Sequence, residues 1–230
     1  MKIAVIGAME QEVELLREEI DNAQTTVIAD CEFIEGEVGG RSVILVKSGI
    51  GKVNAAIATT LLLDNYKPDV VLNTGSAGGF DERLEVGTVV ISDEVRHHDV
   101  DVTAFGYEHG QVPGLPAAYG SDERLIQIAR EVVEEIGEHQ HATGLIASGD
   151  TFMSDLDHVN AVKEHFPSMI AGEMEAAAVA QVCHRFGTPF VVIRALSDIA
   201  GKDSSISFDE FLPIAARHST DIVLKAISKL

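Results

Sequence analysis

The sequence predicts an α/β fold in which helices flank a mixed central β-sheet. Short, continuous apolar runs rich in Val and Ile alternate along the chain with stretches that have a helical period. Hydrophobic residues make up 46% of the 230 residues and charged residues 23%, which is a globular composition. Because no linker, repeat or low-complexity segment breaks this alternation, we expect residues 1–230 to form a single domain.

The predicted strands are apolar runs of the length that a sheet buries. Lys2–Ile6 and Asp69–Asn73 are continuous runs of the kind found in parallel sheets, and Pro189–Ala195 is the most strand-like segment of the chain. Gly39 and Gly40 join two neighbouring runs, which predicts a hairpin. In chain order, the predicted strands are Lys2–Ile6, Phe33–Val38, Ser42–Lys47, Asp69–Asn73, Gly87–Val95, Thr143–Ser148, Met169–Ala171 and Pro189–Ala195.

The predicted helices have apolar residues three and four positions apart. The first follows the opening strand and carries Val13, Leu16 and Ile20. Ser121 is placed to cap a later helix. The segment from His97 to Gly120 has neither a helical nor a strand-like hydrophobic pattern and is long for a loop that only connects two elements. We therefore expect it to be functional or to cover an interface. The helices expected after the first are Lys52–Tyr66, Ser121–Ile136, Asp157–Glu164, Glu173–Phe186 and Phe208–Ser228.

The charge balance excludes several kinds of partner. Seventeen Lys and Arg against 37 Asp and Glu give a formal net charge of −20. Nucleic acids and anionic membrane surfaces require clustered basic residues, and the sequence has no such cluster. No run is long and apolar enough for a membrane span or a signal peptide. Small neutral or zwitterionic ligands remain open. Cys31 and Cys183 form no disulfide framework, so we expect reduced cysteines in a cytoplasmic protein.

Two short motifs approach known ligand-binding patterns without matching them. Gly49–Asn54 has the glycines of a phosphate-binding loop, but it fits neither a dinucleotide fingerprint nor a Walker A loop. His97, His98, Asp99 and Asp101 could ligate a metal. Adjacent residues rarely converge on one ion, however, so a polar loop is the favoured interpretation and no metal or other cofactor is expected.

A set of polar and apolar side chains follows the predicted strands or, for Arg194, lies inside the last one, close to where α/β sheets form their active sites. These side chains are Met9, Glu12, Ser76, Asp150, Phe152, Met153, Glu173, Met174, Glu175, Arg194, Ser197 and Asp198. Carboxylates without a metal motif or a nucleophile–His pair favour acid/base-assisted attack by water, as in glycoside hydrolysis.

Structural roles remain open for the same residues. Glu12 is suited to a helix start and Asp198 to capping a turn, while Phe152 and Met174 are typical of a core. Glu173 and Glu175 are two positions apart, so on a helix at least one of them should be solvated. Composition and spacing alone therefore favour a hydrolase or a binding protein of the α/β class.

Eight sequence blocks resemble the methylthioadenosine/S-adenosylhomocysteine nucleosidase family, which has the nucleoside phosphorylase-like fold. In order they are MKIAVIGAMEQEVELL, SGIGKV, PDVVLNTGSAGG, DVTAFGYEHGQVPG, GLIASGDTF, GEMEAAAVAQVCH, PFVVIRALSD and SFDEF, and the resemblance spans essentially all 230 residues. It implies hydrolysis of the N-glycosidic bond of 5′-methylthioadenosine, S-adenosylhomocysteine and 5′-deoxyadenosine, without a cofactor. One departure is Met153, where a smaller aliphatic residue is common.

The resemblance also implies a role for each site residue. Asp198, oriented by Ser197, would protonate adenine N7, and Glu12 would activate the attacking water with help from Ser76 and Arg194. An ordinary Asp has a pKa of about 3.9, so this one must be raised by burial or receive its proton as the transition state forms. The other implied substrate contacts are Glu175 with the ribose hydroxyls, Met174 under the sugar, Phe152 stacked on the purine, the Met153 backbone at the purine edge, Gly78, and Ile50 and Phe208 around the 5′ substituent.

The resemblance further implies a homodimer. In that arrangement, four loop residues would reach into the neighbouring subunit's pocket: Val102, Phe105, His109 and Pro113. An acid on the base side and a water held opposite imply inversion at C1′.

Two other functions stay open as alternatives. A nucleoside phosphorylase of the same fold would need a phosphate site of basic groups or backbone N–H groups, whereas Glu12 would repel an anion. A purine-nucleoside binding protein would leave its ligand intact and would not need an acid at N7. Phosphate dependence of adenine release separates the first alternative from the hydrolase, and intact nucleoside identifies the second.

Overall fold

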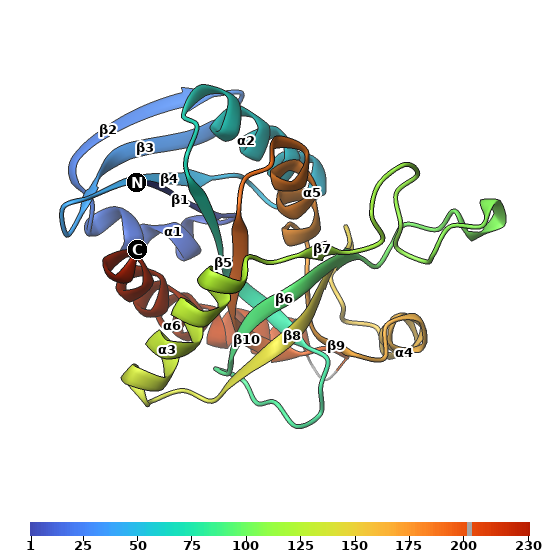
Figure 1. The fold of residues 1–230 in the computed structure, drawn as a ribbon. Coiled ribbons are helices and arrows are strands. Elements are labelled where there is room, and N and C mark those ends of the chain that lie inside the picture. Colours follow the sequence, from blue (N-terminus) through green and yellow to red (C-terminus); the bar gives the residue numbers. More distant parts are fainter. Residues whose placement is uncertain (202–203) are drawn as a thin grey trace.

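Ten strands in the described part of the chain pair into one mixed sheet (Figure 1). The computed structural model describes residues 1–201 and 208–230 in full and, for residues 204–207, the helical backbone alone. The strands are β1 (Lys2–Gly7), β2 (Asp21–Ile28), β3 (Cys31–Val38), β4 (Arg41–Lys47), β5 (Val70–Gly79), β6 (Val89–His97), β7 (Tyr119–Gly120), β8 (His141–Ser148), β9 (Met169–Glu173) and β10 (Phe190–Ile199). The helices are α1 (Glu10–Glu18), α2 (Lys52–Asn65), α3 (Glu123–Ile136), α4 (Leu156–His165), α5 (Ala176–Phe186) and α6 (Ser204–Lys229), with a 3₁₀ turn over Thr103–Phe105.

The sheet curls so that part of it closes on itself. Its order is β10-β6-β8-β9-β5-β1-β4-β3-β2, with β7 paired to β6 and β10 paired also to β5. The strands β5, β9, β8, β6 and β10 therefore form a ring, while β1 to β4 continue as an open sheet. Since β1, β4, β5 and β10 are connected by parallel pairings, their carboxyl ends meet at one edge.

Helices cover both faces of this sheet because its central strands are apolar on both sides. In β1, Ala4 and Ile6 pack into the cluster that includes α2 and α5, whereas Ile3 and Val5 pack into the cluster that includes α1, α3 and α6. The two helix groups lie on opposite sides of the sheet in Figure 1. Each fully buried aliphatic side chain of this kind contributes roughly 1.5–3 kcal/mol, so the strands that carry the site are firmly held.

Two strands continue further than the sequence predicts. We expected them to end at Asn73 and Ala195, but β5 runs to Gly79 and β10 to Ile199. The extension arises because the two strands pair with each other in parallel as far as Ile199 and Gly79. Local patterns do not reveal this pairing, and its consequence is that the polar residues near both carboxyl ends lie in strands rather than in turns.

Several smaller expectations were also wrong. The edge strand β2 was missed because its mostly exposed, polar residues have no apolar alternation. Asp122 rather than Ser121 caps α3, accepting the N–H of Leu125 at 3.1 Å. The strand β7 lies in the segment expected to be irregular, and two helix starts differ, since α5 begins at Ala176 and α6 at Ser204.

Other expectations are confirmed by the structure. The hairpin over Gly39 and Gly40 is present, and both glycines have the positive φ that its turn requires. Cys31 and Cys183 are buried and unpaired. No helix in the described residues has the length and apolar character needed to cross a membrane.

Candidate active site

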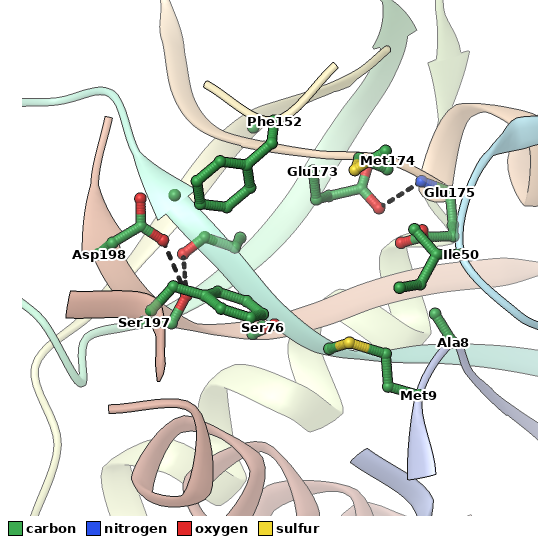
Figure 2. Close-up of a pocket in the computed structure, with 14 residues that line it drawn as sticks. Ala8, Met9, Ile50, Ser76, Phe152, Glu173, Met174, Glu175, Ser197 and Asp198 are labelled. Atoms are coloured by element: carbon green, nitrogen blue, oxygen red, sulfur yellow. Dashed lines mark hydrogen bonds between the residues drawn. The ribbon is translucent and has the colours of Figure 1, made fainter. Parts of the chain in front are cut away.

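A cavity of about 300 Å³ lies at the carboxyl ends of the central strands (Figure 2). Carboxyl groups project from walls that are otherwise largely apolar, as in sites for small ligands. The lining residues are Ala8, Met9, Ile50, Ser76, Ala77, Gly78, Phe152, Gly172, Glu173, Met174, Glu175, Ser197, Asp198 and Phe208. The resemblance implies substrate contacts or catalytic roles for nine of them: Ile50, Ser76, Gly78, Phe152, Met174, Glu175, Ser197, Asp198 and Phe208. Met9 and Glu173 were candidates only because they follow predicted strands.

Glu12 lies next to this lining, on the first turn of α1, with its carboxylate fixed by four donors. One oxygen accepts the N–H groups of Ala8 and Met9 at 2.8 and 3.1 Å, and the other accepts the N–H and Oγ of Ser76 at 2.9 and 3.1 Å. Gly75 makes this approach possible, because its φ is +143° and a Cβ there would lie 2.4 Å from the carboxylate. The structure thus joins Glu12 and Ser76, as the sequence predicts.

Arg194 lies behind the cavity and holds its acidic wall in place. Its guanidinium is buried, donates to the Ser76 carbonyl at 2.9 Å and Asn73 Oδ1 at 3.1 Å, and pairs with Glu173 at 2.7 Å and Glu175 at 3.3 Å. Neither Arg194 nor Asn73 lines the cavity. Arg194 thus lies behind the lining and contacts Ser76, Glu173 and Glu175, while the help that the resemblance implies it gives to Glu12 stays a prediction. Asn73 was missed from the sequence as a partner of Arg194, and its one signal was that it is a polar residue inside an otherwise apolar strand.

The expectation that Glu173 or Glu175 is solvated was wrong, since both are buried. It assumed that both residues lie on a helix, but Glu173 ends β9 and Glu175 precedes the first residue of α5. Glu173 does serve the helix start, because it accepts the N–H groups of Glu175 and Ala176 at 2.9 and 2.8 Å. It also accepts a hydrogen bond from the Ser148 hydroxyl.

Glu175 also reaches across to α2, where its Oε1 accepts the N–H of Gly51 at 2.9 Å. Burial, with a smaller contribution from the neighbouring Glu173 and Glu12, raises the pKa of Glu175, and the charge of Arg194 opposes that rise. The group is therefore a buried acceptor with one backbone donor and one charged partner. The Gly51 contact was missed from the sequence, because a backbone N–H carries no residue signature.

Among the carboxyl groups at the cavity, Asp198 has the fewest described hydrogen-bonding or charged partners. It is 2% exposed, and its described hydrogen bond comes from the Ser197 hydroxyl at 2.9 Å. Burial raises the pKa of Asp198 to about 6, and the bond from Ser197 opposes that rise. Gly78 lies against the carboxyl group, since a Cβ there would come within 3.2 Å of it. A group with this pKa can hold a proton close to neutral pH.

Two aromatic rings form an apolar wall of the cavity. Phe152, 41% exposed, meets Phe208 edge to face with ring centroids 5.6 Å apart. Met153 packs into the cluster beneath α4, and its carbonyl oxygen accepts the N–H of Gly201 at 3.1 Å. It does not line the main cavity and belongs instead to a smaller adjoining one.

The four loop residues predicted to reach a neighbouring subunit lie outside this chain's own cavity: Val102, Phe105, His109 and Pro113. Their loop projects away from the sheet (Figure 1). Phe105 is 81% exposed, whereas the His109 ring stacks on His165 of α4 at 3.9 Å. Over the described residues, no group of three or more His, Cys, Asp or Glu side chains could hold a metal ion.

Comparisons with known proteins agree with this geometry. The family model of the phosphorylase superfamily matches residues 2–228. The chain is 70% identical to 5′-methylthioadenosine/S-adenosylhomocysteine nucleosidase of Lysinibacillus sphaericus and 66% identical to that of Bacillus subtilis, with 100% of each chain covered.

Solved structures show the same fold. The nucleosidase of Neisseria meningitidis, in complex with methylthio-immucillin-A, has a TM-score of 0.98 at 50% identity, covering 100% of this chain and 99% of that one. The Colwellia psychrerythraea nucleosidase, in complex with adenine, has a TM-score of 0.98 at 50% identity, covering 100% and 96%. The chain therefore belongs to the phosphorylase superfamily and, within it, to the 5′-methylthioadenosine/S-adenosylhomocysteine nucleosidases.

Proposed function

We propose that the protein hydrolyses the N-glycosidic bond of 5′-methylthioadenosine and S-adenosylhomocysteine, and also that of 5′-deoxyadenosine, to adenine and the 5-substituted ribose. The observation that carries this proposal is the arrangement of carboxyl groups around one cavity. Asp198 lies on one side and Glu175 on the other, with Ser76 and Phe152 between them (Figure 2). Relatives in complex with adenine and methylthio-immucillin-A support a nucleoside as the ligand.

Asp198 acts as the general acid in this proposal. Adenine is a poor leaving group as an anion, and protonation of its N7 lets it depart neutral. The raised pKa of Asp198, caused by burial, supports a carboxyl group that carries the required proton, and the Ser197 hydroxyl orients it. Phe152 would stack on the purine, and the Met153 backbone would contact its edge. Positioned proton transfer of this kind contributes about 10²–10⁴ in rate.

Glu12 and Glu175 act on the sugar side. As the bond to adenine breaks, positive charge develops on the ribose, and the Glu12 carboxylate, fixed in a water-poor site, stabilises it. Four donors hold Glu12 in place, which supports its role in binding and activating the attacking water beside Ser76. Glu175 would accept the ribose hydroxyls above Met174, and Ile50 and Phe208 would surround the 5′ substituent.

The phosphorylase alternative is disfavoured by the charges around the cavity. Among the described lining residues there is no Lys or Arg, and the nearby guanidinium of Arg194 is engaged by Glu173 and Glu175. A phosphate anion would therefore meet carboxylates without a free cation to hold it. A water nucleophile carries no such penalty.

Adenine release from methylthioadenosine tests the proposal. Purified protein should form adenine and free methylthioribose at the same rate in phosphate-free buffer and with phosphate added, as followed by chromatography. Asp198→Asn keeps the size and hydrogen bonding of the side chain but cannot transfer a proton to N7, so its turnover should fall about 10²–10⁴-fold. Methylthioribose 1-phosphate formed only with phosphate would establish the phosphorylase instead, and intact nucleoside in both buffers would favour the binding protein.

Gly75→Ala tests the role of Glu12 without altering any polar group. The added Cβ would collide with the Glu12 carboxylate and displace it. Since misplacement by about 1 Å can cost about 10²-fold in rate, kcat should fall by that order while adenine binding, measured by calorimetry, persists. The control is Gly39→Ala, which also has positive φ but no atom within 4 Å of its Cβ. Equal activity in the two variants would contradict the role of Glu12.

We also propose that two copies form a homodimer in which the 97–120 loop reaches the partner's cavity. Phe105 projects from this loop with 81% of its surface exposed, and Val53 on α2 is 70% exposed, which supports a partner surface. Sedimentation equilibrium should therefore give about twice the 24.6 kDa chain mass. Phe105→Ala should raise KM while the dimer persists, since it removes a contact in the pocket rather than the interface. A fully active monomer would contradict this arrangement.

The cytoplasm is the location we propose. Both cysteines are buried free thiols, the state that a reducing compartment maintains. Cell fractionation that placed the protein outside the cytoplasm would contradict this assignment.

The two main helix layers pack on one continuous sheet, which supports the prediction that residues 1–230 form one domain.

A further inference from the structure

Lys52 and Asp99, from the Gly49–Asn54 and His97–Asp101 motifs, have no part in the function proposed above, yet the structure joins them. Lys52 begins α2, and its Nζ forms an ion pair with one carboxylate oxygen of Asp99. The other oxygen of Asp99 accepts the N–H of Asp150 at 3.0 Å. Asp150 Oδ1 in turn accepts the N–H of Lys52 at 2.8 Å. Three residues that are distant in sequence thus close a ring of interactions.

Each member of the ring belongs to a different segment around the cavity. Lys52 follows Gly51, whose N–H donates to Glu175 Oε1 at 2.9 Å. Asp150 lies two residues before Phe152, on the connection between β8 and α4. Asp99 lies at the start of the loop that carries Phe105. The ring therefore links the segments that bear the Glu175 donor, the aromatic wall and the projecting loop.

The start of α2 depends on this ring for its polar partners. Its N-cap residue is Gly51, which has no side chain to cap the helix, and Asp150 supplies an acceptor from another segment. A cation at the first helical position is opposed by the helix dipole, so Lys52 needs the neighbouring carboxylates. The side chains of Lys52 and Asp99 are 17% and 29% exposed, which limits screening of their ion pair by solvent.

Close approach of the segments depends on one glycine. Gly51 has φ +94°, and a Cβ there would lie 3.1 Å from Asp150 Oδ1. Any larger residue at this position would be strained by the backbone and crowded by the carboxylate. None of the three ring residues lines the cavity, so the ring can affect a ligand only through residues that do.

We propose that Lys52, Asp99 and Asp150 form a latch that holds these three segments together and thereby positions the Gly51 amide on Glu175 and the Phe152 ring over the cavity. Lys52 is then a positioning residue for nucleoside binding. The latch rests on the proposed function, because the ribose and purine contacts of Glu175 and Phe152 are part of that proposal. Its three residues make no described hydrogen bond or ion pair with Asp198 or Glu12, so it acts on binding rather than on proton transfer.

Lys52→Met tests the latch, because methionine keeps the apolar stem and removes the charge. KM for methylthioadenosine should rise about tenfold with kcat changed less than about twofold, the pattern expected when ground-state and transition-state binding weaken equally. Lys52→Arg should restore most of the affinity. Adding Asp99→Asn to Lys52→Met should raise KM less than about twofold further, since both changes break the same ion pair. The control is Lys229→Met, which removes a partly buried lysine paired with Glu131 and Glu135 on the far helices.

Hydrogen exchange supplies a readout that does not depend on activity. In Lys52→Met, amide exchange should accelerate together in peptides that cover residues 49–55, 97–101 and 149–155, and Lys229→Met should leave all three unchanged. Acceleration confined to residues 49–55, or a KM equal to that of the wild type, would overturn the latch. If the wild type released no adenine, the proposed function would fail, while the exchange data would still decide whether the three segments are held together.

Discussion

The buried guanidinium of Arg194 is the constraint on which the rest of the site depends. A fully buried charge is tolerated only with charged and hydrogen-bonding partners, and here Glu173, Glu175, Asn73 and the Ser76 carbonyl supply them. These groups come from β9, the start of α5 and β5, so one cation joins the strands that line the cavity. Removing it would leave two uncompensated buried carboxylates, a loss of roughly 3–5 kcal/mol for a broken buried pair.

The same constraint divides the acidic residues into different chemical roles. Glu173 and Glu175 share the positive charge, and Glu12 is held by four neutral donors. Asp198 is buried, and this burial raises the pKa of its carboxyl group although the hydrogen bond from Ser197 opposes the rise. One cavity can therefore combine a proton donor at the base with fixed hydrogen-bonding carboxyl groups at the sugar, because environment rather than residue type sets the role of each.

Much of this arrangement was predictable from the sequence, and the parts that were not depend on distant contacts. Apolar runs in the sequence indicate buried strands, so the residues at the carboxyl ends of those strands could be predicted. The edge strand β2 could not, because backbone pairing to β3 rather than apolar packing holds it. The length of β5 and β10 follows from their mutual pairing. Likewise, Glu173 and Glu175 are both buried because each forms an ion pair with the guanidinium of Arg194 on β10. Their spacing in the sequence does not reveal this shared partner.

The stereochemistry of the sugar product reports directly on which face of the ribose the water attacks. With Asp198 on the base side and water held by Glu12 on the opposite face, a β-nucleoside should give the α-anomer of methylthioribose first. Proton NMR of the reaction at early times, before the anomers equilibrate, follows this signal. Initial formation of the α-anomer is the expected result. Initial formation of the β-anomer would show retention, and would contradict direct attack by a water held opposite the departing base.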